Sequence, residues 1–168
     1  LLEAMAERQV TIGGVTYPLP SPFLVLATQN PLEQEGTYPL PEAQADRFML
    51  KVLIDYPSEV NERGILMGSV ARQSKEEALK SVVGPEDLVR IQVAMDEVHV
   101  EDLILDYILS IVRATREADR VSTGLAKYID FGASPRASLS LLSASKAKAL
   151  MRGRAYVTPD DVKSVCAS

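Results

Sequence analysis

The run Phe23-Leu24-Val25-Leu26-Ala27 is apolar at every position and stops at the polar tetrapeptide Thr28-Gln29-Asn30-Pro31. A continuous apolar run of this length is typical of a strand covered on both faces, as in a parallel sheet flanked by helices. A second strand is predicted at 49–54, where the pattern stops before Pro57. These two strands predict an α/β sheet in the first part of the chain.

The segment before the first predicted strand has a different pattern. Apolar residues alternate with polar ones on both sides of Gly13-Gly14, which predicts a β-hairpin over 8–20. A short helix is expected at 42–47. Residues 1–8 have helical spacing with no capping residue before them, and residue 1 is Leu rather than Met. We therefore expect the chain to be a piece of a longer protein.

After Pro57 the sequence has only helical patterns. Proline at the first helical position, followed by acidic residues, marks helix starts at Pro85 and Pro159. The expected helices lie at about 58–70, 75–81, 85–98, 101–118, 135–151 and 159–167. The chain therefore divides into the end of an α/β core at 1–57, connecting helices at 58–84 and an all-helical domain at 85–168.

Two of these helices have a face that is predicted to be buried. In the helix at 101–118 the apolar stripe consists of Ile104, Tyr107, Ile108, Ile111, Val112 and Thr115. In the helix at 135–151 the expected buried residues are Leu139, Leu142, Ala147 and Leu150.

Composition excludes several classes of protein. The 168 residues include 18 Lys+Arg and 23 Asp+Glu, for a net charge of −5, and no apolar run is long enough to span a membrane. An acidic chain is a poor general binder of nucleic acid. A single Cys excludes an internal disulfide, and one Cys with one His argues against a structural zinc site within one chain. These counts favour a cytoplasmic protein.

Asn30 is the first candidate functional residue. Ligands of open α/β sheets bind beyond the carboxyl ends of the strands, and Asn30 follows such an end. Its amide can donate and accept hydrogen bonds, so it could position a water molecule beside a phosphate. The alternative is an Asn-Pro turn with a local bond from side chain to backbone.

Arg47 is the second candidate, at the end of the predicted short helix and just before the second strand. A guanidinium is always charged and its geometry matches phosphate oxygens, so Arg47 could stabilise phosphoryl transfer on a neighbouring subunit's nucleotide. The alternative is an intrachain salt bridge to Asp46 or Glu42.

Arg136 is the third candidate. Ser134 is expected to cap a helix that has Pro135 and Arg136 in its first turn. A helix N-terminus already carries a partial positive charge, so an Arg there does not help helix stability. The combination favours the binding of an anion.

Other motifs have structural explanations. Asp96-Glu97 resembles the end of a metal-binding strand, but Pro85 opens a helix there, so both acids are expected on a helix surface. The Arg113, Arg116 and Arg120 run is expected to be a solvated helical face.

Taken together, these pieces resemble the MoxR family of AAA+ ATPases over essentially the whole chain. The strings that carry the resemblance are Leu1 to Thr11, Ala27-Thr28-Gln29-Asn30-Pro31, Gly36 to Gln44, Asp46-Arg47-Phe48 and Gly132-Ala133-Ser134-Pro135-Arg136-Ala137. No single string is decisive, whereas their joint order and spacing are highly specific.

The resemblance implies a role for each candidate. Asn30 is similar to sensor 1, which orients the attacking water. Arg47 is similar to the arginine finger, which acts in trans on ATP held by the next subunit. Arg136 is similar to sensor 2, which reaches from the helical lid to the γ-phosphate of its own subunit's ATP. Residues 1–57 then correspond to the end of the AAA+ core and 85–168 to its lid.

The resemblance also implies properties of the parent protein. These are ATP and Mg²⁺ as cofactors, a homo-oligomeric ring (a hexamer), and chaperone-like remodelling or maturation of client proteins, often with von Willebrand factor A-type partners. The sequence departs from the family in two respects: no G-x-x-x-x-G-K-[ST] phosphate loop occurs in the 168 residues, and no apolar strand ending in Asp-Glu precedes the hairpin. The chain by itself is therefore expected to bind no nucleotide tightly and to be inactive as an ATPase.

Two other interpretations remain open. The chain could be a non-catalytic helical module that docks partner proteins. It could also bind nucleic acid through the hairpin and the arginine face, which the acidic net charge disfavours.

Overall fold

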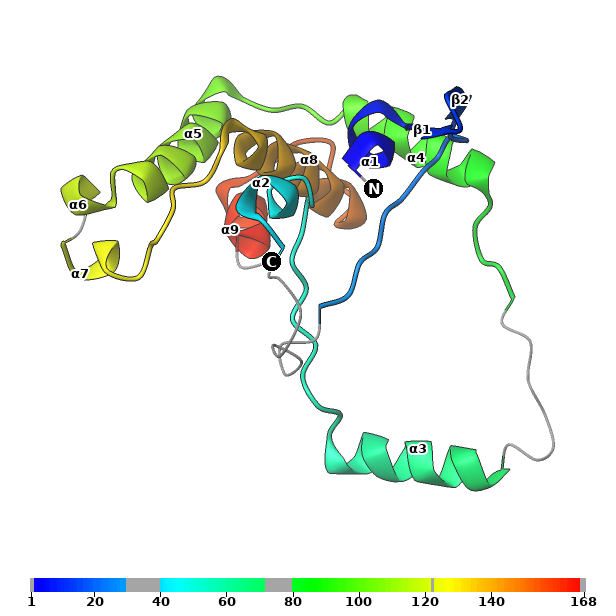
Figure 1. Cartoon of the computed structure of the whole chain (residues 1–168). Coiled ribbons are helices and arrows are strands. Elements are labelled where there is room, and N and C mark those ends of the chain that lie inside the picture. Colours follow the sequence, from blue (N-terminus) through cyan, green and yellow to red (C-terminus); the bar gives the residue numbers. More distant parts are fainter. Residues whose placement is uncertain (1, 30–39, 72–79, 122, 167–168) are drawn as a thin grey trace.

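The structure is a computed structural model that describes residues 2–29, 40–71, 80–121 and 123–166 (Figure 1). Its first part contains α1 (Leu2–Glu7), β1 (Gln9–Ile12), β2 (Val15–Pro18) and α2 (Glu42–Ala45). The remainder is helical, with α3 (Glu59–Ala71), α4 (Pro85–Asp96), α5 (Asp102–Arg116), α6 (Ala118–Val121), α7 (Thr123–Ala126), α8 (Pro135–Met151) and α9 (Pro159–Val165).

The predicted hairpin is confirmed. β1 and β2 pair antiparallel from Gln9 opposite Pro18 to Ile12 opposite Val15. The two-residue turn between them has φ of 60° at Gly13 and 82° at Gly14, values that glycine adopts without steric cost.

The strands predicted at 23–27 and 49–54 are wrong: both segments lie in extended coil. A strand needs a hydrogen-bonded neighbour, and among the described residues only β1 and β2 pair with each other as strands. The apolar side chains remain on the surface as a result, with Leu26 86% exposed and Ile54 89% exposed. The expectation that the run at 23–27 is covered on both faces is therefore wrong as well.

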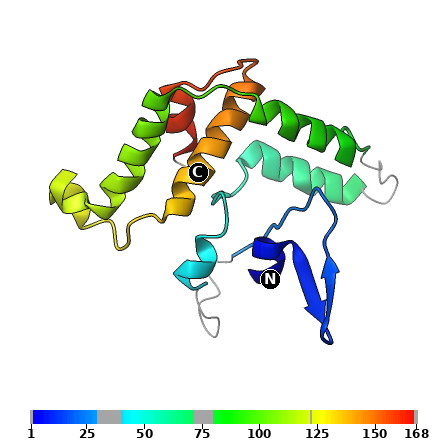
Figure 2. The ribbon, with the colours of Figure 1, turned by 90° about the horizontal axis from the view of Figure 1, so that it is seen from above.

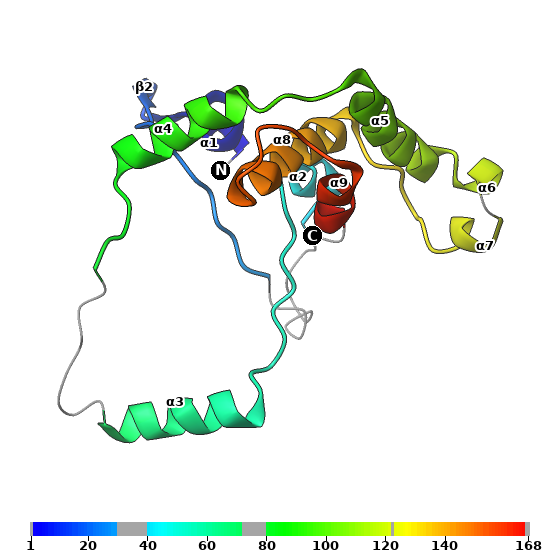
Figure 3. The ribbon, with the colours of Figure 1, turned by 180° about the vertical axis from the view of Figure 1, so that it is seen from behind.

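The core of the described residues lies among α5, α8 and α9, which pack side by side in all three views (Figures 1, 2 and 3). Backbone hydrogen bonds between His99 and the segment 155–157 close one end of this group, with His99 N donating to Ala155 O at 2.8 Å and Val157 N to His99 O at 3.0 Å. The buried cluster consists of Val98, Ile104, Ile108, Ala149, Val157 and Val162.

The helix faces were predicted with mixed success. In α5, Ile104, Ile108 and Val112 are buried and the rest of the predicted stripe is half-buried, as expected. In α8, Leu139 is 66% exposed, so its predicted burial is wrong. The buried residues of α8 are instead the small Ala144, Ser145 and Ala149. Small side chains let the backbones approach closely where α8 packs against several helices, and this selects a face that hydrophobicity alone does not identify.

Asp161 fixes the start of α9. Its side chain is fully buried, and its carboxylate accepts hydrogen bonds from Arg154 at 2.5 and 2.7 Å, from Arg152 at 2.9 Å, and from the Thr158 hydroxyl at 2.8 Å and backbone N–H at 2.9 Å. The bond from Arg154 is the main reason that the pKa of Asp161 lies well below its usual range. A seven-residue helix is too short to be stable alone, so this cluster and the core hold it in place.

α3 lies apart from the helical group in Figures 1 and 3 and leaves Val60, Ile65, Leu66 and Met67 more than half exposed. The helix expected at 75–81 falls almost entirely on residues 72–79, which lie outside the described residues. Among the described helices, none is long and apolar enough to cross a membrane.

Candidate functional site at the start of α8

The N-terminus of α8 is built as the sequence predicts. Ser134 is the N-cap, and its hydroxyl oxygen accepts a hydrogen bond from the Arg136 backbone N–H at 3.1 Å. Pro135 occupies the first turn and needs no hydrogen-bond partner for its nitrogen. The Arg136 side chain extends from this turn and is 55% exposed. A long helix therefore presents its positive end and a guanidinium at one place.

The carboxylate of Asp46, at the end of α2, binds to this N-terminus of α8. One carboxylate oxygen accepts a hydrogen bond from the Ser134 hydroxyl at 2.5 Å, and the other pairs with Arg136 Nη1 at 3.1 Å. The Ser134 hydroxyl is the largest cause, followed by Arg136, of a pKa of Asp46 below its usual range. The start of α8 thus holds an ionised oxyanion that comes from a segment about 90 residues earlier in the chain.

The loop before α8 is anchored to the end of α5. Ala133 N donates to Thr115 Oγ1 at 2.9 Å, and Arg116 Nε donates to Ala133 O at 2.6 Å. Gly132 lies directly on Arg116: a Cβ at this position would be 2.6 Å from Arg116 Cγ and 2.7 Å from its Cα. A side chain at Gly132 would therefore push the loop away and move Ser134.

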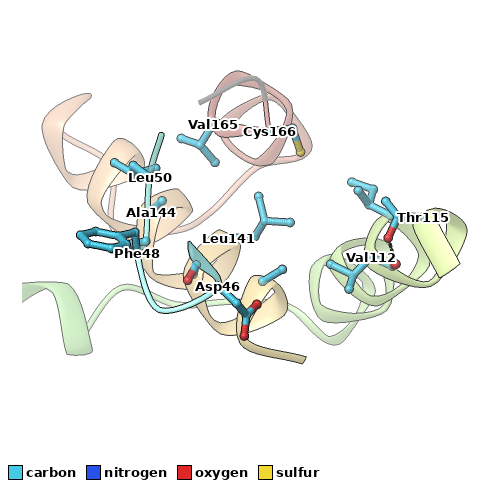
Figure 4. Close-up of a pocket in the computed structure, with 13 residues that line it drawn as sticks. Asp46, Phe48, Leu50, Val112, Thr115, Leu141, Ala144, Val165 and Cys166 are labelled. Atoms are coloured by element: carbon cyan, nitrogen blue, oxygen red, sulfur yellow. Dashed lines mark hydrogen bonds between the residues drawn. The ribbon is translucent and has the colours of Figure 1, made fainter. Parts of the chain in front are cut away.

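An apolar pocket of about 280 Å³ lies beside this site (Figure 4). Asp46, Phe48 and Leu50 line it from one side, and Val112, Thr115, Leu141 and Ala144 line it from α5 and α8. Phe48 and Leu50, from the segment after α2, thus lie across this pocket from side chains of α5 and α8.

The structure answers some of the site predictions. Asn30 lies outside the described residues. Arg47 is half-buried and follows Asp46, and Asp46 pairs with Arg136 rather than with Arg47 as the alternative interpretation of Arg47 proposed. Arg136 lies at a capped helix start, as expected. Asp96 and Glu97 are exposed at the end of α4, and in the described ranges no group of three or more His, Cys, Asp or Glu is placed to hold a metal ion.

Three residues have contacts here that the sequence does not predict. For Asp46 the sequence suggests only Arg47 as a partner, and no local pattern indicates its distant partner Arg136. For Thr115 the sequence predicts a place in the buried stripe, and for Arg116 a place on a solvated face with Arg113 and Arg120. In the structure Arg113 pairs with Glu117 at 3.6 Å and Arg116 binds the loop before α8, whereas the Arg120 side chain is not among those described.

Comparison with known proteins identifies both parts of the chain. The model of the ATPase family associated with various cellular activities (AAA) matches residues 1–50, and that of the AAA lid domain matches residues 121–168. The second match includes the whole of α8 and α9, and the first includes Asp46 and Arg47.

Similar proteins extend these matches over nearly the whole chain. The chain is 48% identical over 168 residues to chaperone MoxR1 of Mycobacterium tuberculosis, covering 98% of this chain and 43% of the relative. It is 44% identical to the protein YeaC of Bacillus subtilis, covering 97% of this chain and 48% of that one. Protein MoxR of Paracoccus denitrificans is 29% identical, with 99% and 52% covered.

A solved structure agrees with the fold. It belongs to a Cytophaga hutchinsonii protein assigned as an ATPase, with a TM-score of 0.89 and 44% identity, and the match covers 99% of this chain and 51% of that chain. The chain thus spans about half the length of the relatives that it matches.

Proposed function

Because the chain belongs to the MoxR family of AAA+ ATPases, we propose that the protein containing it hydrolyses ATP and uses the energy to remodel or mature other proteins. The observation that carries this proposal is the binding of an oxyanion by Ser134 and Arg136 at the start of α8. A γ-phosphate offers the same kind of oxygen atoms as the carboxylate of Asp46.

The residues at this helix start suit a phosphate. The dipole of a 17-residue helix favours an anion, the Ser134 hydroxyl can donate, and the half-exposed Arg136 has further N–H groups. Arg136 would therefore act as sensor 2. Mg²⁺, bound with ATP in the whole protein, would neutralise charge on the phosphates; we assign none of the described residues as its ligand.

We assign Arg47 to a different nucleotide. As an arginine finger it would stabilise charge on the ATP of the next subunit, and such a residue contributes about 10³–10⁵ to the rate in related phosphoryl transfers. This role requires a ring of identical subunits, for which we propose a hexamer. Asn30 would act as sensor 1 and orient the attacking water.

These 168 residues contain no phosphate loop. We therefore propose that they do not hydrolyse ATP by themselves and supply instead the trans-acting and sensing residues. Client proteins, including von Willebrand factor A-type partners, and a cytoplasmic location belong to the same proposal. The single cysteine is consistent with a reducing compartment.

The test is ATP hydrolysis by the full-length protein and its Arg47→Ala and Arg136→Ala variants. Both variants should lose at least about 100-fold in rate while remaining folded. Arg90→Ala is the matched control, because Arg90 is an exposed arginine on α4 whose partner among the described residues is Asp87, three residues earlier. Its rate should stay within about twofold of the unchanged protein.

Mixing separates action in trans from action in cis. Arg47→Ala mixed with a variant of the phosphate-loop lysine should partly restore hydrolysis. The Arg47→Ala subunit retains the lysine that binds ATP, and the lysine variant retains Arg47 to act on that ATP. Normal hydrolysis by a folded Arg47→Ala variant would refute the arginine finger and favour the non-catalytic docking module.

A further inference from the structure

We propose that Asp46 is a positioning residue that couples Arg136 to Arg47: it holds Arg136 while no γ-phosphate is bound, and it is released, together with the adjacent Arg47, when a γ-phosphate takes its place. This inference rests on the function proposed above. It assigns to Asp46 the task of reporting the nucleotide state of one subunit to the arginine that acts on the next.

Asp46 occupies the Ser134 hydroxyl and one guanidinium nitrogen of Arg136. Its two oxygens are divided between Ser134 Oγ at 2.5 Å and Arg136 Nη1 at 3.1 Å. A phosphate that binds Arg136 at the helix start therefore competes with this carboxylate for the same donors. Two anions also repel each other at such a distance, so binding of the phosphate favours departure of Asp46.

Arg136 and Asp46 differ in how well water can reach them if their ion pair separates. The Arg136 side chain is 55% exposed, whereas that of Asp46 is 27% exposed. Arg136 can therefore exchange one anion for another without leaving a buried charge. The Asp46 carboxylate loses its hydrogen bonds on exchange and must turn toward water.

Asp46 and Arg47 belong to the same turn of backbone at the end of α2. Asp46 N donates to Glu42 O at 2.8 Å, Arg47 N to Gln44 O at 3.2 Å and Phe48 N to Ala45 O at 3.0 Å. These bonds join the two residues to α2 as a unit. A displacement of Asp46 relative to α8 is consequently also a displacement of the backbone that carries Arg47.

The experiment measures nucleotide affinity in the full-length protein by calorimetry, with AMP-PNP and ADP as probes. Asp46→Asn should bind AMP-PNP about fivefold more tightly than the unchanged protein, because a competing anion has been removed, and ADP binding should not change. In the Arg136→Ala background the same substitution should have no effect on either probe. Asp46→Glu, which retains the carboxylate, should restore the lower affinity for AMP-PNP.

A role of Asp46 in folding alone predicts a different result. Asp46→Asn would then weaken both nucleotides equally, or would have the same effect with and without Arg136, and either result overturns the proposal. Asp106→Asn, which removes an exposed carboxylate from α5, controls for the change in net charge and should change neither affinity. Failure of the proposed function is distinct: Arg136→Ala alone would then leave AMP-PNP and ADP affinities unchanged.

The coupling to Arg47 is tested in mixed assemblies. A subunit whose phosphate-loop lysine is replaced holds no γ-phosphate, so its Asp46 still holds Arg136. Its Arg47 should therefore activate ATP hydrolysis by the neighbouring subunit only weakly. Adding Asp46→Asn to those subunits should raise the neighbours' hydrolysis severalfold. No increase would show that release of Asp46 does not reach Arg47.

Discussion

Replacing Asp161 by Asn tests the reasoning on the helical domain most directly. The two side chains have the same shape, so the substitution leaves no cavity. It replaces a carboxylate oxygen by an NH₂ group inside a ring of donors from Arg152, Arg154 and Thr158. At least one of these donors would lose its acceptor and face another donor.

The structure sets the expected size of the effect. Removing one partner of a buried ion pair costs about 3–5 kcal/mol. Arg154 and Arg152 are 23% and 46% exposed, so water can solvate them after the change, and Asn retains one accepting oxygen. Both features favour the lower end of this range of about 3–5 kcal/mol. We therefore expect the free energy of unfolding to fall by about 3 kcal/mol, or the melting temperature by about 6–12 °C for a chain of this size.

The assay is urea unfolding followed by circular dichroism at the helical minimum. Asp160→Asn is the matched control, because Asp160 is the adjacent residue in the same first turn, is 83% exposed and forms a long ion pair with Lys163, at 3.8 Å. Its cost should be below about 1 kcal/mol. Equal losses for the two variants would refute the argument that burial and the two arginines make Asp161 important.

The pH dependence follows from the lowered pKa of Asp161. Because the folded protein binds this proton less readily than the unfolded chain, the stabilisation by Asp161 is fully present above the ordinary carboxyl pKa of about 4 and is lost as pH falls through the lowered pKa. The difference in unfolding free energy between the unchanged protein and Asp161→Asn should be constant from about pH 5 to 7 and should shrink below about pH 4.

Three further substitutions have definite expectations. Gly132→Ala should lower stability by about 2 kcal/mol in urea unfolding, because its Cβ would lie 2.6 Å from Arg116 Cγ; an unchanged midpoint would contradict the close approach. Val162→Ala should cost about 2 kcal/mol in the same assay, since Val162 is fully buried, whereas Val60→Ala, at a position 79% exposed, should cost less than about 0.5 kcal/mol. Gly14→Ala should speed amide exchange in the hairpin by about fivefold, because φ is 82° and a Cβ would meet no atom of the described residues within 4 Å, so that the cost is backbone strain; unchanged exchange would argue against the left-handed turn.

The helices were largely predictable because their signals are local. Proline and acidic residues mark the starts of α4 and α9, and the stripe on α5 is buried where its spacing indicates. The strands at 23–27 and 49–54 were not predictable in the same way, because pairing depends on a neighbour elsewhere and hydrophobicity does not supply one. The short helices α6 and α7 have no strong periodic signal, and the sequence analysis gave them no separate prediction.

The candidate site was predictable at one end only. Ser134, Pro135 and Arg136 carry their signal in three consecutive residues, and the structure places them at a capped helix start. The partner in this contact is Asp46, 90 residues away from Arg136, and no spacing rule connects the two. Sequence patterns identify the chemical types that meet at such a site more readily than the pairs that form.

α8 can be regarded as a lever. Its first turn carries Arg136, and Lys146, ten residues further along the helix, donates to Asp96 O at the end of α4. Ten residues of α-helix span about 15 Å, so a tilt of about 10° about the first turn moves the Lys146 end by about 2.5 Å. A displacement of this size is comparable to a hydrogen-bond length. A tilt of this size would therefore be large enough to break or re-form the contact between Lys146 and the end of α4.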